Sequence, residues 1–379
     1  MFDAQNSKES DFLKKHFREY YLNHTISSVP ELELREFGYG VFKRKIANRN
    51  LAFSSAIELN SFLREKAPLF FSYSNSCYNY PEKTPTLMKG WLKADLIYEF
   101  DADELGLSVE EINGVQWFEK SHLDEAKRQV FRLLDFIEND FNFSLNGVSV
   151  NFSGKAGYHI HLRSEEIQKL NKRARIELVD YLTAHNMDFV NLGFDTIALL
   201  CPTHNGLWSR RMVDGIKDFF NKDPKEIAKI VSSTQKKVTA FVGIKDRIFD
   251  AMSNGKLIPY DTKKNDVFWQ RVLEVVSKQL VVPIDRQTST DLNKIVRVPM
   301  TLHGDTGLLA KTVSIDELKN FDPYVDSVVF GKDMVNVHVI KAPKFSLGGE
   351  VFGPFEDSTE SLPLFCAVYL IGKGAAVLI

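Results

Sequence analysis

The segment 95–103 concentrates acidic side chains in a pattern that suggests metal chemistry. Its sequence, DLIYEFDAD, alternates polar with bulky apolar residues, as in a strand whose side chains point alternately to two faces. Four acids then share one face: Asp95, Glu99, Asp101 and Asp103. Their mutual repulsion is costly unless cations neutralise it, and Mg²⁺ and Mn²⁺ are hard ions that prefer oxygen ligands. The alternative is a strand end with solvated acids.

A glycine-rich turn at 153–157 has the composition of an anion-binding site. Two glycines bracket Lys155, so that backbone N–H groups can approach an anion closely, while Ser153 and Lys155 add a hydroxyl group and a charge. His159 and His161 follow on one strand face, where either could contact a phosphate or a carboxylate. A tight hairpin with structural histidines is one alternative. A two-His metal site is another, although no third ligand lies nearby in the sequence.

The segment 284–307 combines an acid, two cations and a histidine. Asp285 opens it, Lys294 and Arg297 lie on an expected strand, and His303 begins a second glycine turn. Such a run offers a metal carboxylate and cations for triphosphate oxygens. An ordinary polar hairpin is the alternative.

Taken together and in this order, the three segments resemble the three motifs of the catalytic small subunit of archaeal-type (archaeo-eukaryotic) DNA primases. The stretches concerned read GWLKADLIYEFDAD, NFSGKAGYHIHL and IDRQTSTDLNKIVRVPMTLHGDTG. LREFGYG at 34–40 and the tail LPLFCAVYLIGKGAAV are similar to further segments of that family. The resemblance covers most of the chain and is weakest between 205 and 280. It implies an α/β (α+β) fold, with an RRM-like mixed sheet as the catalytic core and a small helical subdomain.

Carried over residue by residue, the resemblance implies a two-metal centre beside a nucleotide site. The catalytic carboxylates that would hold Mg²⁺ or Mn²⁺ are Glu99, Asp101 and Asp285. The nucleotide-binding residues would be Ser153, Lys155, His159, Arg297 and His303. Two more residues are expected near the site, Asp103 and Arg35.

The chain departs from the family pattern in three places. Glu99 stands where the family usually has Asp, and Ala156 where a second basic residue is common. The family also commonly carries a zinc knuckle between the first two motifs, whereas the interval 104–150 contains no Cys and His122 as its single His. A structural zinc needs about four ligands, so we expect none here.

The resemblance implies template-directed, metal-dependent synthesis of short RNA or DNA primers from nucleoside triphosphates, which starts DNA replication. It also implies a heterodimer with a large iron–sulfur subunit and a single-stranded DNA template. Three other classes stay open: another nucleotidyltransferase or repair polymerase, a metal nuclease, and a non-enzymatic RRM-like binding module. Pyrophosphate release and metal-dependent nucleotide binding discriminate among them.

The composition limits the choice of environment and partners. The 379 residues carry a net charge of −2, far less basic than an autonomous DNA-binding domain, so nucleic acid would be bound by local patches or a partner would hold the template. The three Cys are far apart, which favours a reducing compartment without disulfides. No apolar signal core opens the chain, and Pro363 and Gly372 interrupt its most apolar stretch. We therefore expect a cytoplasmic protein with no membrane span, and the resemblance implies that this is the archaeal cytosol.

Periodicity gives a coarse map of the elements. Helices are expected at 8–25, 56–66, 122–140 and 164–184, and strands at 147–152, 158–163 and 294–302. A hairpin is expected around Asn48, from strands at 39–46 and 49–53. The Lys-rich segment 205–280 is expected to form the helical subdomain, inserted into a discontinuous catalytic domain of 1–204 and 281–379.

Overall fold

The computed structural model describes residues 7–379 except 28, 204–205, 262–264 and 285–288. The chain divides into two compact units, one of residues 1–179 and 283–379 and the other of residues 180–282. The expected helical subdomain lies within the second unit. That unit begins before residue 205 because the carbonyl of Tyr181 accepts a hydrogen bond from Trp208 Nε1 (3.0 Å) and the carbonyl of Leu182 one from Val282 N (3.0 Å).

The first unit mixes helices and antiparallel strands, which confirms the expected α+β fold class. Its helices are α1 (Lys8–Asn23), α2 (Ala56–Lys66), α3 (Lys120–Asn139), α4 (Glu165–Gln168), α5 (Lys172–Leu182, continuing into the second unit), α12 (Ile315–Leu318), α13 (Pro323–Asp326) and α14 (Leu364–Lys373). Its strands before the second unit are β1 (Arg35–Val41), β2 (Arg44–Leu51), β3 (Phe70–Tyr78), β4 (Trp91–Ala94), β5 (Leu96–Asp101), β6 (Glu110–Ile112), β7 (Val115–Trp117), β8 (Val148–Phe152) and β9 (Gly157–Leu162). Its strands after the second unit are β10 (Ile295–Arg297), β11 (Thr312–Val313), β12 (Met334–Ala342), β13 (Phe345–Leu347), β14 (Glu350–Phe352), β15 (Phe355–Pro363) and β16 (Ala376–Leu378).

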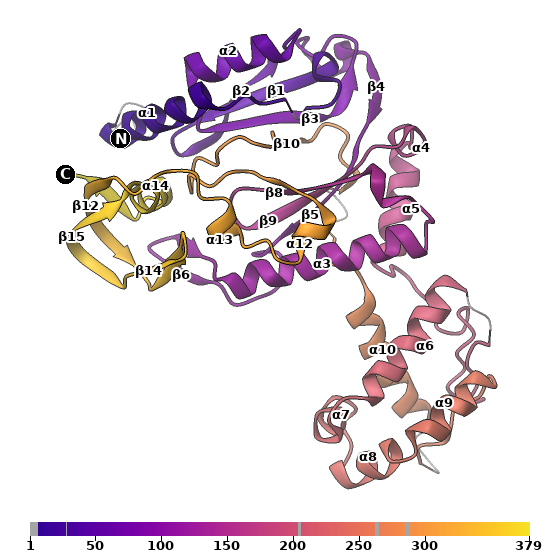
Figure 1. Ribbon diagram of the computed structural model, residues 1–379. Helices are drawn as coiled ribbons and strands as arrows, with labels where there is room; N and C mark the ends of the chain where they lie inside the picture. The colour runs from indigo at the N-terminus through magenta and orange to yellow at the C-terminus, as the bar shows by residue number, and fades with distance from the viewer. Residues whose placement is uncertain (1–6, 28, 204–205, 262–264, 285–288) are drawn as a thin grey trace. The chain divides into compact units, whose positions relative to one another are not determined.

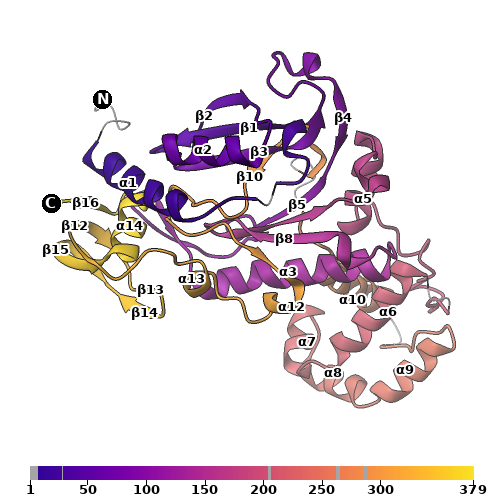
Figure 2. The ribbon, with the colours of Figure 1, turned by 45° about the horizontal axis from the view of Figure 1, so that its top comes forward.

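Two sheets form the middle layers of this unit. One has the order β10-β3-β1-β2, with β4 also paired to β3, and the other has the order β11-β8-β9-β5. Helix α2 covers the outer side of the first sheet, and α3 runs along the outer side of the second (Figure 1). The turned view in Figure 2 shows the same layering. In it, β10, the edge strand of the first sheet, lies on the side of β3 that is nearer to the second sheet. The inner sides of the two sheets therefore face each other.

The burial of each element follows its position in these layers. All nine residues of β3 are buried, because its strand lies between neighbours in the sheet and between two layers. Helix α3 buries the expected apolar stripe, which includes Leu123, Val130 and Ile137, and confirms the helix expected at 122–140 to within two residues. Glu119 and the side chain of His122 form a capping box at its N-terminus.

Three expected elements differ from the structure. The hairpin turn lies at Phe42–Lys43 and not at Asn48, because Lys43 adopts the left-handed conformation (φ 61°) that closes β1 onto β2. The helix expected at 164–184 is split into α4 and α5, and the side chain of Asn171 caps the start of α5 at Ala174 N. The strand expected at 294–302 ends at Arg297, shortly before Pro299, which has no N–H to donate.

The C-terminal part of the first unit is a smaller β-structure around the apolar helix α14. The sheet has the order β15-β12-β16, and every residue of α14 is buried. Burial of a ten-residue helix on all sides explains why this is the most apolar stretch of the sequence. Among the described residues, no helix combines the length and apolarity needed to cross a bilayer.

The second unit is helical in its described residues apart from short turns and bridges. Its helices are α6 (Leu207–Phe220), α7 (Pro224–Ile230), α8 (Gln235–Val242), α9 (Lys245–Ser253) and α10 (Asn265–Leu280). Its core is aromatic: Phe220, Phe241, Phe268 and Trp269 pack against one another with ring centroids 5.3–6.4 Å apart.

Candidate active site

One pocket of about 300 Å³ collects residues from all three sequence segments. Its lining comes from β5 and β9 of one sheet and from β2, β3 and β10 of the other. Of the residues expected at the site, those that line the pocket are Glu99, Asp101, Asp103, Ser153, Lys155, His159, Arg297 and His303. Arg35 does not line it, and Asp285 lies outside the described residues.

The acidic wall of the pocket is the inner face of β5. Strand alternation turns Tyr98 and Phe100 into the protein core, so that Glu99 and Asp101 point to the pocket, as the alternating pattern predicts. In the register with β9, Glu99 pairs with His159 and Asp101 with Gly157. A Cβ atom at residue 157 would overlap Asp101 Oδ1, so this position requires glycine for the backbone to approach the carboxylate.

Glu99 and Asp101 have opposite electrostatic surroundings. Lys294 Nζ lies 2.6 Å from Glu99 Oε2, and His159 Nε2 lies 3.4 Å from Glu99 Oε1. Burial raises the pKa of Glu99, but the charges of His159 and Lys294 outweigh it and leave that pKa below its usual value. For Asp101, burial and the negative charges of Glu99 and Asp103 raise the pKa, although His159 opposes them. Asp101 is thus the carboxylate that would gain most from an added cation.

Two glycine turns, at 153–157 and 303–307, also contribute to the lining of the pocket. Ser153 Oγ accepts hydrogen bonds from the N–H groups of Lys155 (3.3 Å) and Gly157 (3.2 Å), which leaves its own proton available to a ligand. The first turn packs directly on the second: a Cβ at Gly154 (φ 84°) would lie 2.8 Å from His303 Cβ. Thr306 Oγ1 also donates to the carbonyl of Gly154 (2.5 Å). Ser153, Lys155 and His303 are therefore held as one group.

Arg297 presents donors that nothing in the described chain satisfies. Its Nε and Nη1 are buried and have no hydrogen-bond partner among the described residues, and the guanidinium lies 5.2 Å from the centroid of the Phe70 ring. Burial lowers the pKa of Arg297 to about 10, which still leaves it charged at neutral pH. Unsatisfied buried donors on a charged group are costly, so Arg297 is prepared for an anionic ligand.

His303 is a neutral hydrogen-bond donor in the same pocket. Its Nδ1 accepts the N–H of Asp305 (3.2 Å), which places the ring proton on Nε2. Burial, followed by the charges of Arg297 and Lys155, holds the pKa of His303 well below its usual value. A neutral ring with its proton on Nε2 can donate to a phosphate oxygen.

Three further polar residues line the pocket without being among the site residues expected from the family resemblance: Lys45, Ser72 and Lys294. Lys294 was considered in the third segment, as a cation for triphosphate oxygens, but was not among the residues carried over from the family. Lys45 lies in the basic run Lys43-Arg44-Lys45, and the sequence alone does not distinguish lysines that line a pocket from lysines on a solvated hairpin. Ser72 lies within a continuous buried strand. Neither carries a signal of its own in the sequence.

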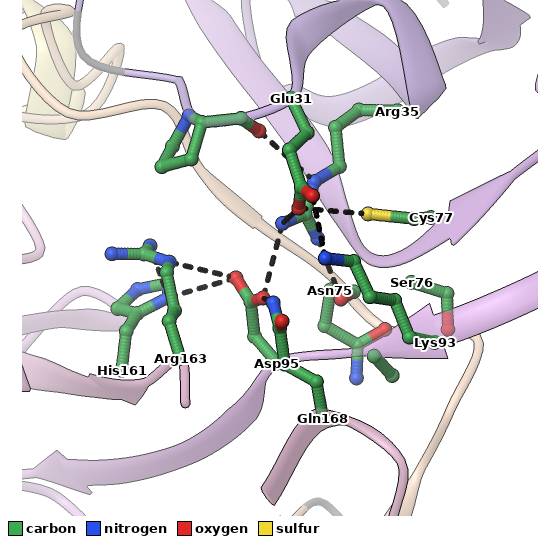
Figure 3. Close-up of polar contacts among 12 residues, drawn as sticks. Glu31, Arg35, Asn75, Ser76, Cys77, Lys93, Asp95, His161, Arg163 and Gln168 are labelled. Carbon is green, nitrogen blue, oxygen red and sulfur yellow. Dashed lines mark hydrogen bonds and ion pairs between the residues drawn. The ribbon is translucent and has the colours of Figure 1, made fainter. Parts of the chain in front are cut away.

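Arg35 belongs to a separate buried network around Asp95, shown in Figure 3. The side chain of Asp95 has no exposure and accepts hydrogen bonds from Arg35 Nη2 (3.0 Å), Arg163 Nε (2.9 Å) and Gln168 Nε2 (2.8 Å). Arg163 also donates to Nδ1 of His161 (2.9 Å), so His161 belongs to this network and does not reach the pocket. The network joins β1 of the first sheet to β9 of the second, and its role is to hold the two sheets together.

Metal ligation can be assessed for two of the three expected carboxylates. Among the described residues, no three His, Cys, Asp or Glu side chains lie close enough together to hold a metal ion. Glu99 and Asp101 share one wall of the pocket, and the third expected ligand lies outside the described residues. In the interval where a zinc knuckle was considered, both ring nitrogens of His122 are hydrogen-bonded, to Glu119 N and to the carbonyl of Ser108 (both 2.9 Å). The absence of a structural zinc stays a prediction.

Comparison with known proteins gives one consistent result. A model of the DNA primase small subunit family matches residues 114–315. The DNA primase small subunit PriS of Methanothrix thermoacetophila is 32% identical to the chain, over 98% of this chain and 99% of that protein. The PriS proteins of Methanosarcina barkeri and Archaeoglobus fulgidus are 29% and 27% identical, over 98% and 96% of this chain and 97% of each relative. The chain therefore belongs to the DNA primase small subunit family.

Proposed function

We propose that the pocket catalyses template-directed, metal-dependent nucleotidyl transfer, by which the protein makes short primers from nucleoside triphosphates on single-stranded DNA. One observation carries this proposal: the same pocket has an acidic wall at Glu99 and Asp101 on β5 and, on β10 of the other sheet, the buried donors of Arg297 that no described residue satisfies. A triphosphate with bound divalent cations matches both sides, because its oxygens bind the cations as well as the guanidinium.

The acids are suited to hold two Mg²⁺ or Mn²⁺ ions. Glu99 and Asp101 offer hard oxygen donors, and the raised pKa of Asp101 reflects a burial and repulsion that a cation would relieve. Asp285 is proposed as the third ligand on the resemblance alone. When bound, the cations would activate the attacking 3′-hydroxyl and neutralise charge on the leaving pyrophosphate.

The protein's own donors would orient the triphosphate. The Ser153 hydroxyl, the Lys155 ammonium and the Nε2–H of His303 lie on the joined glycine turns, and Arg297 supplies a planar guanidinium beside them. His159, opposite Glu99 on the neighbouring strand, connects the acidic wall to this side. Fixed donors aimed at developing charge are the main means of catalysis in phosphoryl transfer.

A heterodimer with a large iron–sulfur subunit is part of the proposal. The relatives carry the name small subunit, which supports a larger partner. The net charge of −2 fits a division of labour in which that partner contributes to template binding.

The test is primer synthesis on single-stranded DNA, with each nucleotide pool and with Mg²⁺ or Mn²⁺. Asp101→Asn removes a carboxylate charge from the pocket and should lower the rate by about a thousandfold or more. Asp357→Asn is the matched control, because Asp357 is 87% exposed on β15, and it should retain full activity.

Two results would contradict the proposal. One is undiminished product from Asp101→Asn. The other is metal-dependent cleavage of DNA without consumption of nucleotides or release of pyrophosphate, which would indicate a nuclease.

A further inference from the structure

A second pocket, of about 260 Å³, adjoins the first, and Lys155 lines both. Five segments of the first unit converge on it: the β1–β2 turn, the β6–β7 hairpin, the two glycine turns and the end of α14. Its charged lining residues are Lys43, Lys155, Lys373, Glu111 and Asp305. Of these lysines, only Lys155 was assigned to a site from the sequence.

Lys373 is a buried ammonium held by the protein without a carboxylate partner. The residue is 9% exposed, and its Nζ donates to the carbonyl of Gln116 (2.8 Å) and lies 4.9 Å from the centroid of the Trp117 ring. No described carboxylate lies within ion-pair distance of it. Burial and the nearby charge of Lys155 lower the pKa of Lys373 to about 7. A bound anion would favour the protonated amine, which has three donors, so Lys373 has donors left for an anionic ligand.

The charge of this pocket is not balanced by its own acids. Lys155 Nζ lies 3.8 Å from Asp305 Oδ2, and the same carboxylate is the negative charge that acts on Lys43 and Lys373. One carboxylate cannot pair closely with three ammonium groups, and Glu111 is exposed. No aromatic ring is among the described residues that line the pocket, so a nucleobase would find no stacking surface there. These features fit a bare phosphate group better than a whole nucleotide.

We propose that the lysine pocket, defined by Lys43, Lys155 and Lys373, binds inorganic pyrophosphate as it leaves the nucleotide pocket. This inference rests on the proposed function. In that reaction the 3′-oxygen bonds to the α-phosphorus, and the bond from this phosphorus to the β-phosphate oxygen breaks. Pyrophosphate departs with the electron pair, and the hydroxyl proton passes to solvent. Because Lys155 lines both pockets, it can stay in contact with the product as the product moves.

The direct test is calorimetric titration of inorganic pyrophosphate into the full-length chain, with Mg²⁺ present. Lys373→Met keeps the length and apolar stem of the side chain but removes the charge, and it should weaken pyrophosphate binding about tenfold. The matched control is Lys341→Met, because Lys341 is a half-exposed lysine on β12 paired with Glu356, and its affinity should be unchanged. Equal affinities for Lys373→Met and wild type would overturn the proposal.

A kinetic measurement separates this pocket from the nucleotide site. In primer synthesis, Lys373→Met should raise the pyrophosphate concentration that halves the rate by about tenfold, while the nucleotide KM changes less than about twofold. An equal change in both quantities would mean that Lys373 belongs to the triphosphate site and would overturn the proposal.

A second variant covers the case in which the first does not fold, and the titration gives a result that does not depend on primer synthesis. If Lys373→Met does not fold, Lys43→Met at the exposed hairpin turn replaces it, with an expected loss of about threefold in pyrophosphate affinity. If the wild-type chain makes no primers, the proposed function fails, but the titration still reports on the lysine pocket. The two failures are therefore distinguishable.

Discussion

Asp95 and Asp101 lie six residues apart along one stretch of chain, but their surroundings shift their pKa values in opposite directions. Asp95 is enclosed by Arg35, Arg163 and Gln168. Burial raises the pKa of Asp95, but His161, Arg35 and Arg163 outweigh burial and hold that pKa far below its usual value. Asp101 is also buried, but its neighbours are acids, and its pKa is raised. The chain supplies cations for the acid that joins its sheets. In the proposed function, the charge of the pocket acid is instead balanced by a divalent cation from solution.

Removing the charge of Asp95 should give the largest effect among the tests of this comparison between Asp95 and Asp101. Asp95→Asn leaves Arg35 and Arg163 without their carboxylate in a buried site, so we expect the free energy of unfolding to fall by about 3–5 kcal/mol. Urea denaturation followed by near-ultraviolet circular dichroism measures it. The exposed control Asp357→Asn should change stability by less than about 0.5 kcal/mol. Equal free energies of unfolding for Asp95→Asn and Asp357→Asn would show that the buried charge of Asp95 does not stabilise the fold.

The next effect concerns metal binding. At a concentration about 100 times the dissociation constant, Mg²⁺ or Mn²⁺ should stabilise the folded chain by about 2.7 kcal/mol, and removal with a chelator should reverse this. Thermal unfolding with and without the metal measures the change. Asp101→Asn should lose most of the stabilisation, whereas Asp357→Asn should keep it. A metal-induced shift of the same size in Asp101→Asn would show that the ion binds elsewhere.

The pH dependence gives a smaller effect with a defined sign. Because the pKa of Asp95 is lowered by folding, its stabilising contribution is complete above the unfolded pKa of about 3.9 and is lost as the pH falls below it. The stability difference between wild type and Asp95→Asn should therefore be constant from about pH 5 to 7. Below about pH 4 it should shrink by up to about 1.4 kcal/mol per pH unit. A difference that grows on acidification would contradict the assignment.

The smallest expected effect is on the metal-free stability of Asp101→Asn. Removing a charge that Glu99 and Asp103 repel should leave the chain as stable as wild type, or more stable by up to about 1 kcal/mol. Chelator-treated wild type and variant are compared by urea denaturation. Destabilisation by several kcal/mol would mean that Asp101 is a structural acid like Asp95.

The sequence predicted features that depend on local periodicity. The alternation of residues 95–103 correctly separates Tyr98 and Phe100 from the acids, and the apolar stripe of residues 122–140 matches the buried face of α3. Both patterns are set by the repeat of a single element, which a sequence displays directly. The three sequence segments also carry the residue types of the pocket, because glycine turns and clustered acids have few structural uses.

What could not be predicted depends on partners far along the chain. Arg35 was expected near the site, but its partner Asp95 is 60 residues away, and nothing in either residue's neighbourhood indicates the pair. Lys45 and Lys373 reach their pockets through packing between elements that are distant in sequence. The hairpin turn was placed wrongly because Asn48 is a better turn former than Lys43 by composition, and pairing with β3 decided the register.

The pairing of β3 with β10 has a consequence for how the chain is made. Residues 72–74 of β3 bond to residues 295–297, so this part of the strand edge has no partner until the second unit has been synthesised. At about 5–20 residues per second, the roughly 200 intervening residues take about 10–40 s to emerge from the ribosome. Throughout that time the nascent chain exposes part of the edge of a strand that is buried in the folded protein, and this edge is open to pairing with other chains.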